Sequence, residues 1–88
     1  MRIKQGYVLR QVAGLWVVLP LAEETVNFNG MMKLNDCGAL LWKQLERGCE
    51  LDELVDAVLA EYRVTREQAQ ADAAEFLEKL SKAGCLEL

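Results

Sequence analysis

The side chains that most often carry chemistry are sparse in this sequence. The 88 residues include no histidine, which removes the Ser-His-Asp and Cys-His mechanisms, histidine metal ligation and a histidine pH switch. Cys37, Cys49 and Cys85 are odd in number and lack a C-x-x-C spacing, so we expect small reduced apolar side chains rather than a disulfide framework. There is no Gly-rich phosphate-binding motif. The sequence therefore predicts a protein that is not an enzyme and that holds no metal and no cofactor.

The charges are unevenly distributed along the chain. The net charge is −4. Residues 1–48 carry 6 basic and 4 acidic side chains (+2), whereas residues 49–88 carry 4 basic and 10 acidic side chains (−6). Nucleic-acid affinity depends on neutralising phosphates, so an acidic back half disfavours a nucleic-acid partner.

The front of the chain has the composition of β-strands. Residues 7–12 and 15–19 are rich in β-formers and are joined by Ala13-Gly14, which predicts a hairpin. Pro20 cannot donate to a ladder and marks the end of the second strand. Residues 26–34 predict a third strand, in which alternation places four side chains on one face. These are Val26, Phe28, Met32 and Leu34.

The back of the chain has helical periodicity. Asn35 is a good N-cap for a helix that ends near Gly48, and a second helix carries a continuous apolar stripe from Leu51 to Tyr62. Thr65 with Gln68 predicts a capping box that opens a third helix. That helix buries Ala69, Ala73, Phe76, Leu77 and Leu80 and ends at Gly84. Residues 85–88 form a tail that packs back or pairs as a strand. The pattern predicts one α+β domain over residues 1–88, with three antiparallel strands before three helices.

Three helices cannot cover both faces of such a sheet, so we expect one solvated face and at least one open edge. An open edge accepts an extended peptide by β-augmentation. The third strand is the best candidate, since it carries Met31 and Lys33 in the exposed phase, adaptable methionine side chains (Met31 and Met32), and a glycine, Gly30, that allows close backbone approach. Two alternatives stay open: the methionines fill the core, and Lys33 is a solvated edge lysine.

The stretch from Phe28 to Trp42 resembles the PqqD-like family, whose pattern runs F-N-x-[ST/G] to L-N-x-[ST/C]-G-[AS]-x-[LI]-W. The front from Gly6 to Pro20 and the back from Leu51 to Leu86 are also similar to that family. The resemblance implies a small winged-helix-like fold. It also implies a peptide chaperone that binds the leader of a ribosomally made precursor peptide and presents it to a modifying enzyme, often a radical S-adenosylmethionine protein.

In that family the leader adds beside the third strand, in a groove walled by the third helix. Carried over to this sequence, the strand side consists of Phe28, Asn29, Gly30, Met31, Met32, Lys33 and Leu34. The helix side consists of Gln70, Ala73, Ala74, Leu77 and Ser81. Small residues at 73 and 74 leave room for leader side chains, although helix propensity explains them equally well.

A winged-helix nucleic-acid-binding regulator is the alternative function, because the fold alone permits it. An open edge used only for self-association is another. No apolar segment is long enough to cross a bilayer, so we expect a soluble cytoplasmic protein, monomeric or homodimeric, with no membrane partner.

Overall fold

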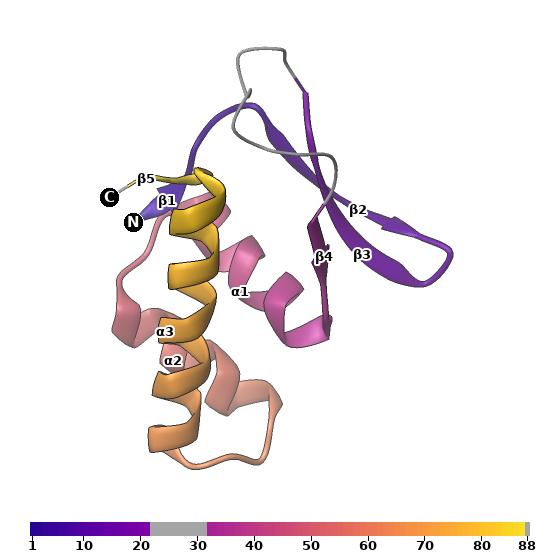
Figure 1. Cartoon of the computed structure of the whole chain (residues 1–88). Helices are drawn as coiled ribbons and strands as arrows, with labels where there is room; N and C mark the ends of the chain where they lie inside the picture. Colours follow the sequence, from indigo (N-terminus) through magenta and orange to yellow (C-terminus); the bar gives the residue numbers. More distant parts are fainter. Residues whose placement is uncertain (22–31, 88) are drawn as a thin grey trace.

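The computed structural model describes residues 1–21 and 32–87, which form two antiparallel sheets and three helices (Figure 1). In chain order the elements are β1 (Arg2–Ile3), β2 (Tyr7–Val12), β3 (Leu15–Pro20), β4 (Met32–Leu34), α1 (Asp36–Arg47), α2 (Leu51–Glu61), α3 (Arg66–Ala83) and β5 (Leu86–Glu87). One sheet has the order β2-β3-β4, and the other pairs β1 with β5. The predicted α+β class, with three antiparallel strands followed by three helices, is confirmed.

The β2–β3 hairpin turns through two residues. Val12 pairs with Leu15, which leaves Ala13 and Gly14 as the loop. Both have positive φ, 51° and 81°. This is the conformation of a type I′ turn, whose twist matches that of the flanking strands. β3 ends at Pro20, as predicted.

The described part of the predicted third strand is short. β4 spans Met32–Leu34, and the other residues of the predicted 26–34 strand lie outside the described residues. Lys33 is exposed and Leu34 is buried, which is the predicted alternation. The expected solvated face is only partly open, because the neighbouring residues Val17 and Val18 of β3 point to opposite faces and are both buried.

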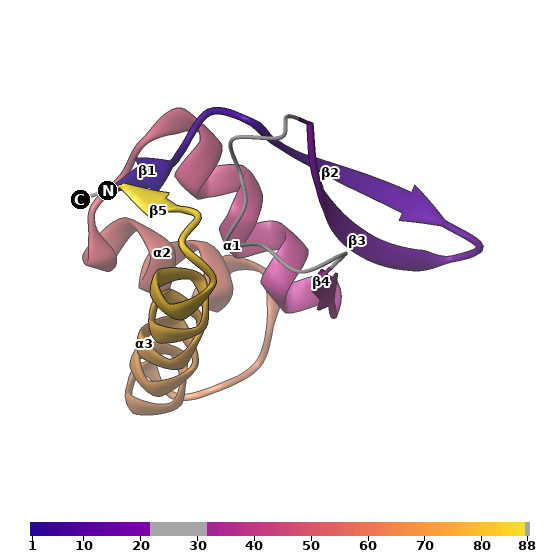
Figure 2. The same cartoon turned by 45° about the horizontal axis from the view of Figure 1, so that its top comes forward.

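Helix α1 is the centre of the fold. The predicted N-cap is present, since the Asn35 Oδ1 accepts a hydrogen bond from the Gly38 N–H at 2.7 Å, and Gly48 ends the helix with φ 83°. Figures 1 and 2 place α1 between the larger sheet and the other two helices. Its side chains Leu41, Trp42 and Leu45 are buried and form the middle of the core.

The cap of α3 differs in part from the prediction. The Thr65 Oγ1 accepts from the Gln68 N–H at 3.1 Å, as a capping box requires. The Gln68 side chain does not return to Thr65, however, because its Nε2 donates to the Asp72 Oδ1 at 2.8 Å. Asp72 lies one turn further along the helix surface, where (i, i+4) side chains meet. Only half of the predicted capping box forms.

The chain ends lie side by side (Figure 1). The predicted tail pairs as strand β5 with β1, a strand that the sequence did not indicate. Two further backbone hydrogen bonds hold the front segment: Cys49 N–H to Met1 O at 2.9 Å and Lys4 N–H to Cys85 O at 2.9 Å. The first residues of the chain therefore close one end of the helical core.

Candidate functional site

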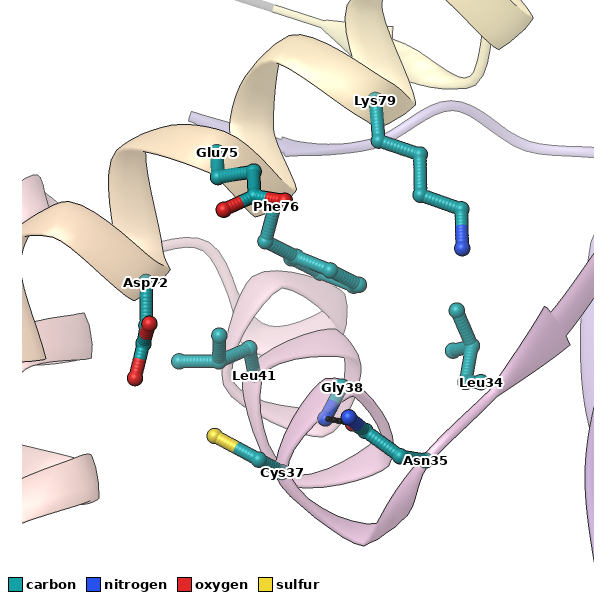
Figure 3. A pocket seen from close by; sticks show the side chains of 9 residues that line it. All are labelled: Leu34, Asn35, Cys37, Gly38, Leu41, Asp72, Glu75, Phe76 and Lys79. Carbon is teal, nitrogen blue, oxygen red and sulfur yellow. Dashed lines mark hydrogen bonds between the residues drawn. The ribbon is translucent and has the colours of Figure 1, made fainter.

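A pocket of about 310 Å³ opens where the end of β4, the start of α1 and the middle of α3 meet (Figure 3). Side chains from all three elements converge on it in the close view. Its lining residues are Leu34, Asn35, Cys37, Gly38, Leu41, Asp72, Glu75, Phe76 and Lys79. Its floor is apolar, because Leu34, Leu41 and Phe76 are buried core residues, while its α3 rim is charged.

Contacts with both β3 and α3 fix the position of the first turn of α1. The Trp16 Nε1 of β3 donates to the Asp36 Oδ1 at 3.0 Å, which ties the helix start to the sheet. At Gly38 a Cβ atom would lie 3.3 Å from Phe76 Cε1 and 3.2 Å from Asn35 Oδ1. The glycine therefore allows the Phe76 ring of α3 to approach α1 closely.

The backbone orientation of β4 follows from the register of the sheet. The Leu21 N–H donates to the Gly6 O at 2.7 Å, so Gly6 and Leu21 form a hydrogen-bonded pair. In an antiparallel ladder every second pair is hydrogen-bonded, and Arg10 with Val17 lies four pairs further along, so it is hydrogen-bonded too. Val17 then points its N–H and C=O at β2, away from β4. Because Val17 lies opposite Lys33, the Lys33 N–H and C=O point away from β3, toward the open edge.

Lys79 reaches this edge from α3. Its Nζ donates to the Lys33 backbone oxygen at 3.2 Å, which agrees with the orientation derived from the ladder. Among the described residues β4 has no second strand partner. We call the pocket together with this open edge the groove, and its two walls are β4 and α3.

Charges are separated along the groove. Asp72 and Glu75 lie toward the N-terminal half of α3, next to the start of α1, whereas Lys79 lies beside β4 (Figure 3). The exposed Lys33 side chain alternates with Leu34 and points to the other face of the sheet, so it does not line the pocket. The groove therefore has an acidic end and a basic end, each next to the apolar floor.

Cys37 is the thiol of the pocket. Burial, and to a lesser extent the Asp72 carboxylate, raises the pKa of this thiol above its ordinary value. Since the thiolate is the nucleophile and the metal ligand, a raised pKa makes Cys37 a poor candidate for either role. Within residues 1–21 and 32–87 no group of three or more Cys, Asp or Glu side chains is placed to hold a metal ion.

The strand side of the predicted site lies partly in the groove. Leu34 lines the pocket, Lys33 presents its backbone to the open edge, and Met32 is half-buried against the core. Four predicted residues lie outside the described residues. These are Phe28, Asn29, Gly30 and Met31.

The helix side of the predicted site does not line the pocket. Ala73 is fully buried in the core, so its side chain is not accessible from the groove. The other four predicted residues belong to a different surface of α3: Gln70, Ala74, Leu77 and Ser81. The α3 residues at the pocket are instead Asp72, Glu75, Phe76 and Lys79.

Helix geometry explains the difference. At about 100° per residue, both sets flank the buried stripe of α3, one on each side of it. Periodicity identifies that stripe, but it does not say which flank faces the strand. Phe76 is the signal that sequence reasoning missed, because a large ring at the border of the stripe marks the side on which α3 meets α1 and β4.

Within the described residues no helix is long and apolar enough to cross a membrane.

One family model and two solved structures match this chain. A sequence model of the PqqD family, described as coenzyme PQQ synthesis protein D, matches residues 16–86. A solved structure of TbiB1 in complex with the TbiA(beta) leader peptide is 31% identical, with a TM-score of 0.79 over 99% of this chain and 95% of that one. A structure of lasso peptide synthetase B1 complexed with the leader peptide is 24% identical, with a TM-score of 0.75 over 96% of this chain and 93% of that one, which supports the fold. A search of curated proteins found no match. The chain belongs to the PqqD family.

Proposed function

We propose that this protein is a non-catalytic module that binds the leader segment of a ribosomally made precursor peptide. The leader adds as a further strand on the open edge of β4 and places a large apolar side chain in the pocket beside α3. The protein then presents the bound precursor to a modifying enzyme.

One observation carries this proposal: the outward N–H and C=O of Lys33 lie next to an apolar-floored pocket. Main-chain hydrogen bonds along an edge give a peptide affinity, and side-chain pockets beside the edge give it register. A volume of about 310 Å³ lies at the small end of the range for ligand pockets. Peptide recognition needs both features, and here they are adjacent.

The comparisons support the same function. TbiB1, at 31% identity over nearly the whole chain, was solved with a leader peptide bound. Two family-level inferences follow for this chain: a leader peptide as ligand, and a separate enzyme that performs the chemistry. The second inference agrees with a chain that contains no histidine and whose thiols at positions 37, 49 and 85 have raised pKa values through burial.

Nothing in the described charges favours nucleic acid. A winged-helix DNA reader places a basic helix against the phosphates. α3 instead carries four acidic and three basic side chains, and two of the acids, Asp72 and Glu75, line the pocket. A polyanion would meet repulsion at the site where the peptide is expected.

The experiment uses proline to remove one N–H from each open edge of the sheet. Lys33→Pro deletes the outward N–H of β4. Gln11→Pro deletes an outward N–H of β2: Gln11 and Trp16 are neighbours of the hydrogen-bonded pair Arg10–Val17, so they form a non-hydrogen-bonded pair and the Gln11 N–H points away from β3. Proline is tolerated at such edge positions. The ligand is the leader of a precursor peptide that is first sought among the genes next to the gene for this chain.

By titration calorimetry Lys33→Pro should weaken leader binding by about tenfold or more, through a lost hydrogen bond and the added ring, and Gln11→Pro should bind like the unsubstituted protein. Circular dichroism checks that both variants are folded. A folded Lys33→Pro variant with unchanged affinity would exclude β4 as the docking edge, and loss of affinity only in Gln11→Pro would move the site to β2.

A further inference from the structure

The side chain of Lys79 occupies the position that an added strand needs. A strand pairs about 4.8 Å from its neighbour and donates its N–H groups to the outward carbonyls of the edge. The outward carbonyl of β4 is that of Lys33, and the Lys79 ammonium already lies 3.2 Å from its oxygen. An incoming strand would have to displace this ammonium before it could pair.

The displaced ammonium needs a new acceptor. Lys79 is exposed in the free protein, but a bound strand would cover part of its ammonium, and a cation that loses water without gaining a partner is unfavourable. The peptide that enters the groove is the nearest source, and a carboxylate gives a cation its strongest hydrogen bond. Glu75, one helical turn from Lys79, is an internal competitor, but it forms no ion pair with Lys79 within 4.0 Å in the described structure, where the salt bridges are Arg66–Asp56 and Lys82–Glu78.

The rest of the groove would repel the same carboxylate. Asp72 and Glu75 line the pocket on the α3 wall and lie away from β4. An acidic peptide residue is therefore favoured at one position, beside Lys79, and disfavoured one turn of α3 away. Attraction of a peptide carboxylate to Lys79, combined with its repulsion by Asp72 and Glu75, fixes the register of the bound peptide as well as its sequence selectivity.

We propose that Lys79 is a specificity-determining residue: it covers the outward carbonyl of β4 in the free protein and pairs with an Asp or Glu of the peptide strand that displaces it. This inference rests on the proposed function. It adds a chemical class of ligand, an extended peptide with a carboxylate next to the residue opposite Lys33, on the face of the added strand that lies toward α3 as Leu34 does. It also gives Lys79 a role in the free protein, because covering an open edge opposes unwanted strand pairing.

The experiment selects peptides from a phage-displayed library of random linear sequences on three proteins. These are the unsubstituted protein, Lys79→Met and the control Lys82→Met. The control removes the same charge from the same helix, at a residue that pairs with Glu78 and does not line the pocket. Methionine keeps the apolar stem of lysine, so both variants retain helix-forming side chains at exposed positions.

Peptides selected on the unsubstituted protein and on Lys82→Met should share an Asp or Glu at one aligned position, and peptides selected on Lys79→Met should not. Replacing that acid by Asn or Gln should weaken binding about threefold to tenfold in the unsubstituted protein and leave binding to Lys79→Met unchanged. Lys79→Arg should keep the preference. The neutral peptide should bind Lys79→Met more tightly than it binds the unsubstituted protein, because no covering hydrogen bond is broken.

Two results would contradict the inference alone. Peptides that bind and lose affinity in Lys33→Pro but show no acidic preference would overturn the role of Lys79 and leave the proposed function intact. So would an acidic preference that persists in Lys79→Met. If the library gives no binder on the unsubstituted protein, and the leader does not bind either, then the proposed function and this inference both fail.

Discussion

At the scale of single residues, the pocket is made by a glycine and a ring. Gly38 leaves the space in which Phe76 reaches α1, and a methyl group there would lie 3.3 Å from both Phe76 Cε1 and Leu34 Cβ. These are closer contacts than packed carbon atoms prefer. The same small residue also supplies the N–H that Asn35 caps, so the cap and the pocket share one position.

Gly38→Ala should weaken leader binding about tenfold, because the added methyl group pushes the Phe76 ring into the pocket. The stability of the fold should change little, since a gain in helix propensity of about 1 kcal/mol offsets the crowding. Titration calorimetry measures the affinity and urea unfolding measures the stability. A folded Gly38→Ala variant with full affinity would show that the pocket does not receive a leader side chain.

Cys37 offers a probe of the same pocket. Burial and the Asp72 carboxylate raise its pKa, so iodoacetamide should modify it slowly at about pH 7 and faster as the pH rises. Saturating leader should slow the reaction further by covering the pocket. Mass spectrometry follows the modification, with Cys37→Ser to account for Cys49 and Cys85. Equal rates with and without bound leader would place the leader elsewhere.

At the scale of elements, the hairpin carries a local strain that sequence reasoning did not expect. Ala13-Gly14 is the predicted link, but Ala13 adopts φ 51°, a left-handed conformation that costs a non-glycine residue roughly 1–2 kcal/mol. The strands impose this geometry, because a two-residue loop matches their twist only when both residues have positive φ.

Ala13→Asn should therefore raise the free energy of unfolding by about 0.5–1 kcal/mol, since asparagine tolerates the left-handed region. Gly14→Ala is the matched reverse change and should lower it by about 1–2 kcal/mol. Urea unfolding of both variants tests the pair. A destabilised Ala13→Asn variant would contradict the type I′ turn. Neither substitution should alter leader affinity, because neither Ala13 nor Gly14 lines the pocket.

The elements also show how far the sequence determines the site. The β2–β3 hairpin, the N-caps at Asn35 and Thr65, and the buried stripe of α3 follow from local patterns. The structure agrees with them, except that Leu77 of the predicted stripe is only half-buried. The sequence-based prediction places the helix wall on the flank with Gln70 and Ser81, whereas Glu75 and Lys79 line the pocket. The choice of flank depends on how α3 packs against α1, a long-range contact that periodicity within one helix does not contain. The pairing of β1 with β5 is also a long-range contact. The sequence does not predict it, because a strand of two residues is too short to show an alternating pattern.

At the scale of the whole molecule, buried thiols link stability to pH. Burial raises the pKa of Cys85 from its ordinary value of 9.0, and burial is also the largest cause of the raised pKa of Cys49. The folded protein thus holds these protons more tightly than the unfolded chain does. Their contribution to stability is complete below about pH 9 and is lost as the pH rises through the folded values.

The free energy of unfolding should accordingly fall as the pH rises above about 9. In Cys85→Ala the fall should be shallower, although the variant is less stable at every pH because it leaves a small cavity in the core. Urea unfolding across this range compares the two slopes. Parallel curves would mean that the Cys85 thiol does not ionise differently in the folded and unfolded states.

Amide hydrogen exchange reports whether a bound leader strand pairs with β4. The sheet has two open edges among its described strands, so exchange is followed at Lys33 on β4 and at Leu9 on β2, whose N–H groups both point away from β3. Saturating leader should slow the exchange of the Lys33 amide by at least about tenfold and leave Leu9 unchanged. Protection of Leu9 with an unchanged Lys33 amide would contradict the account.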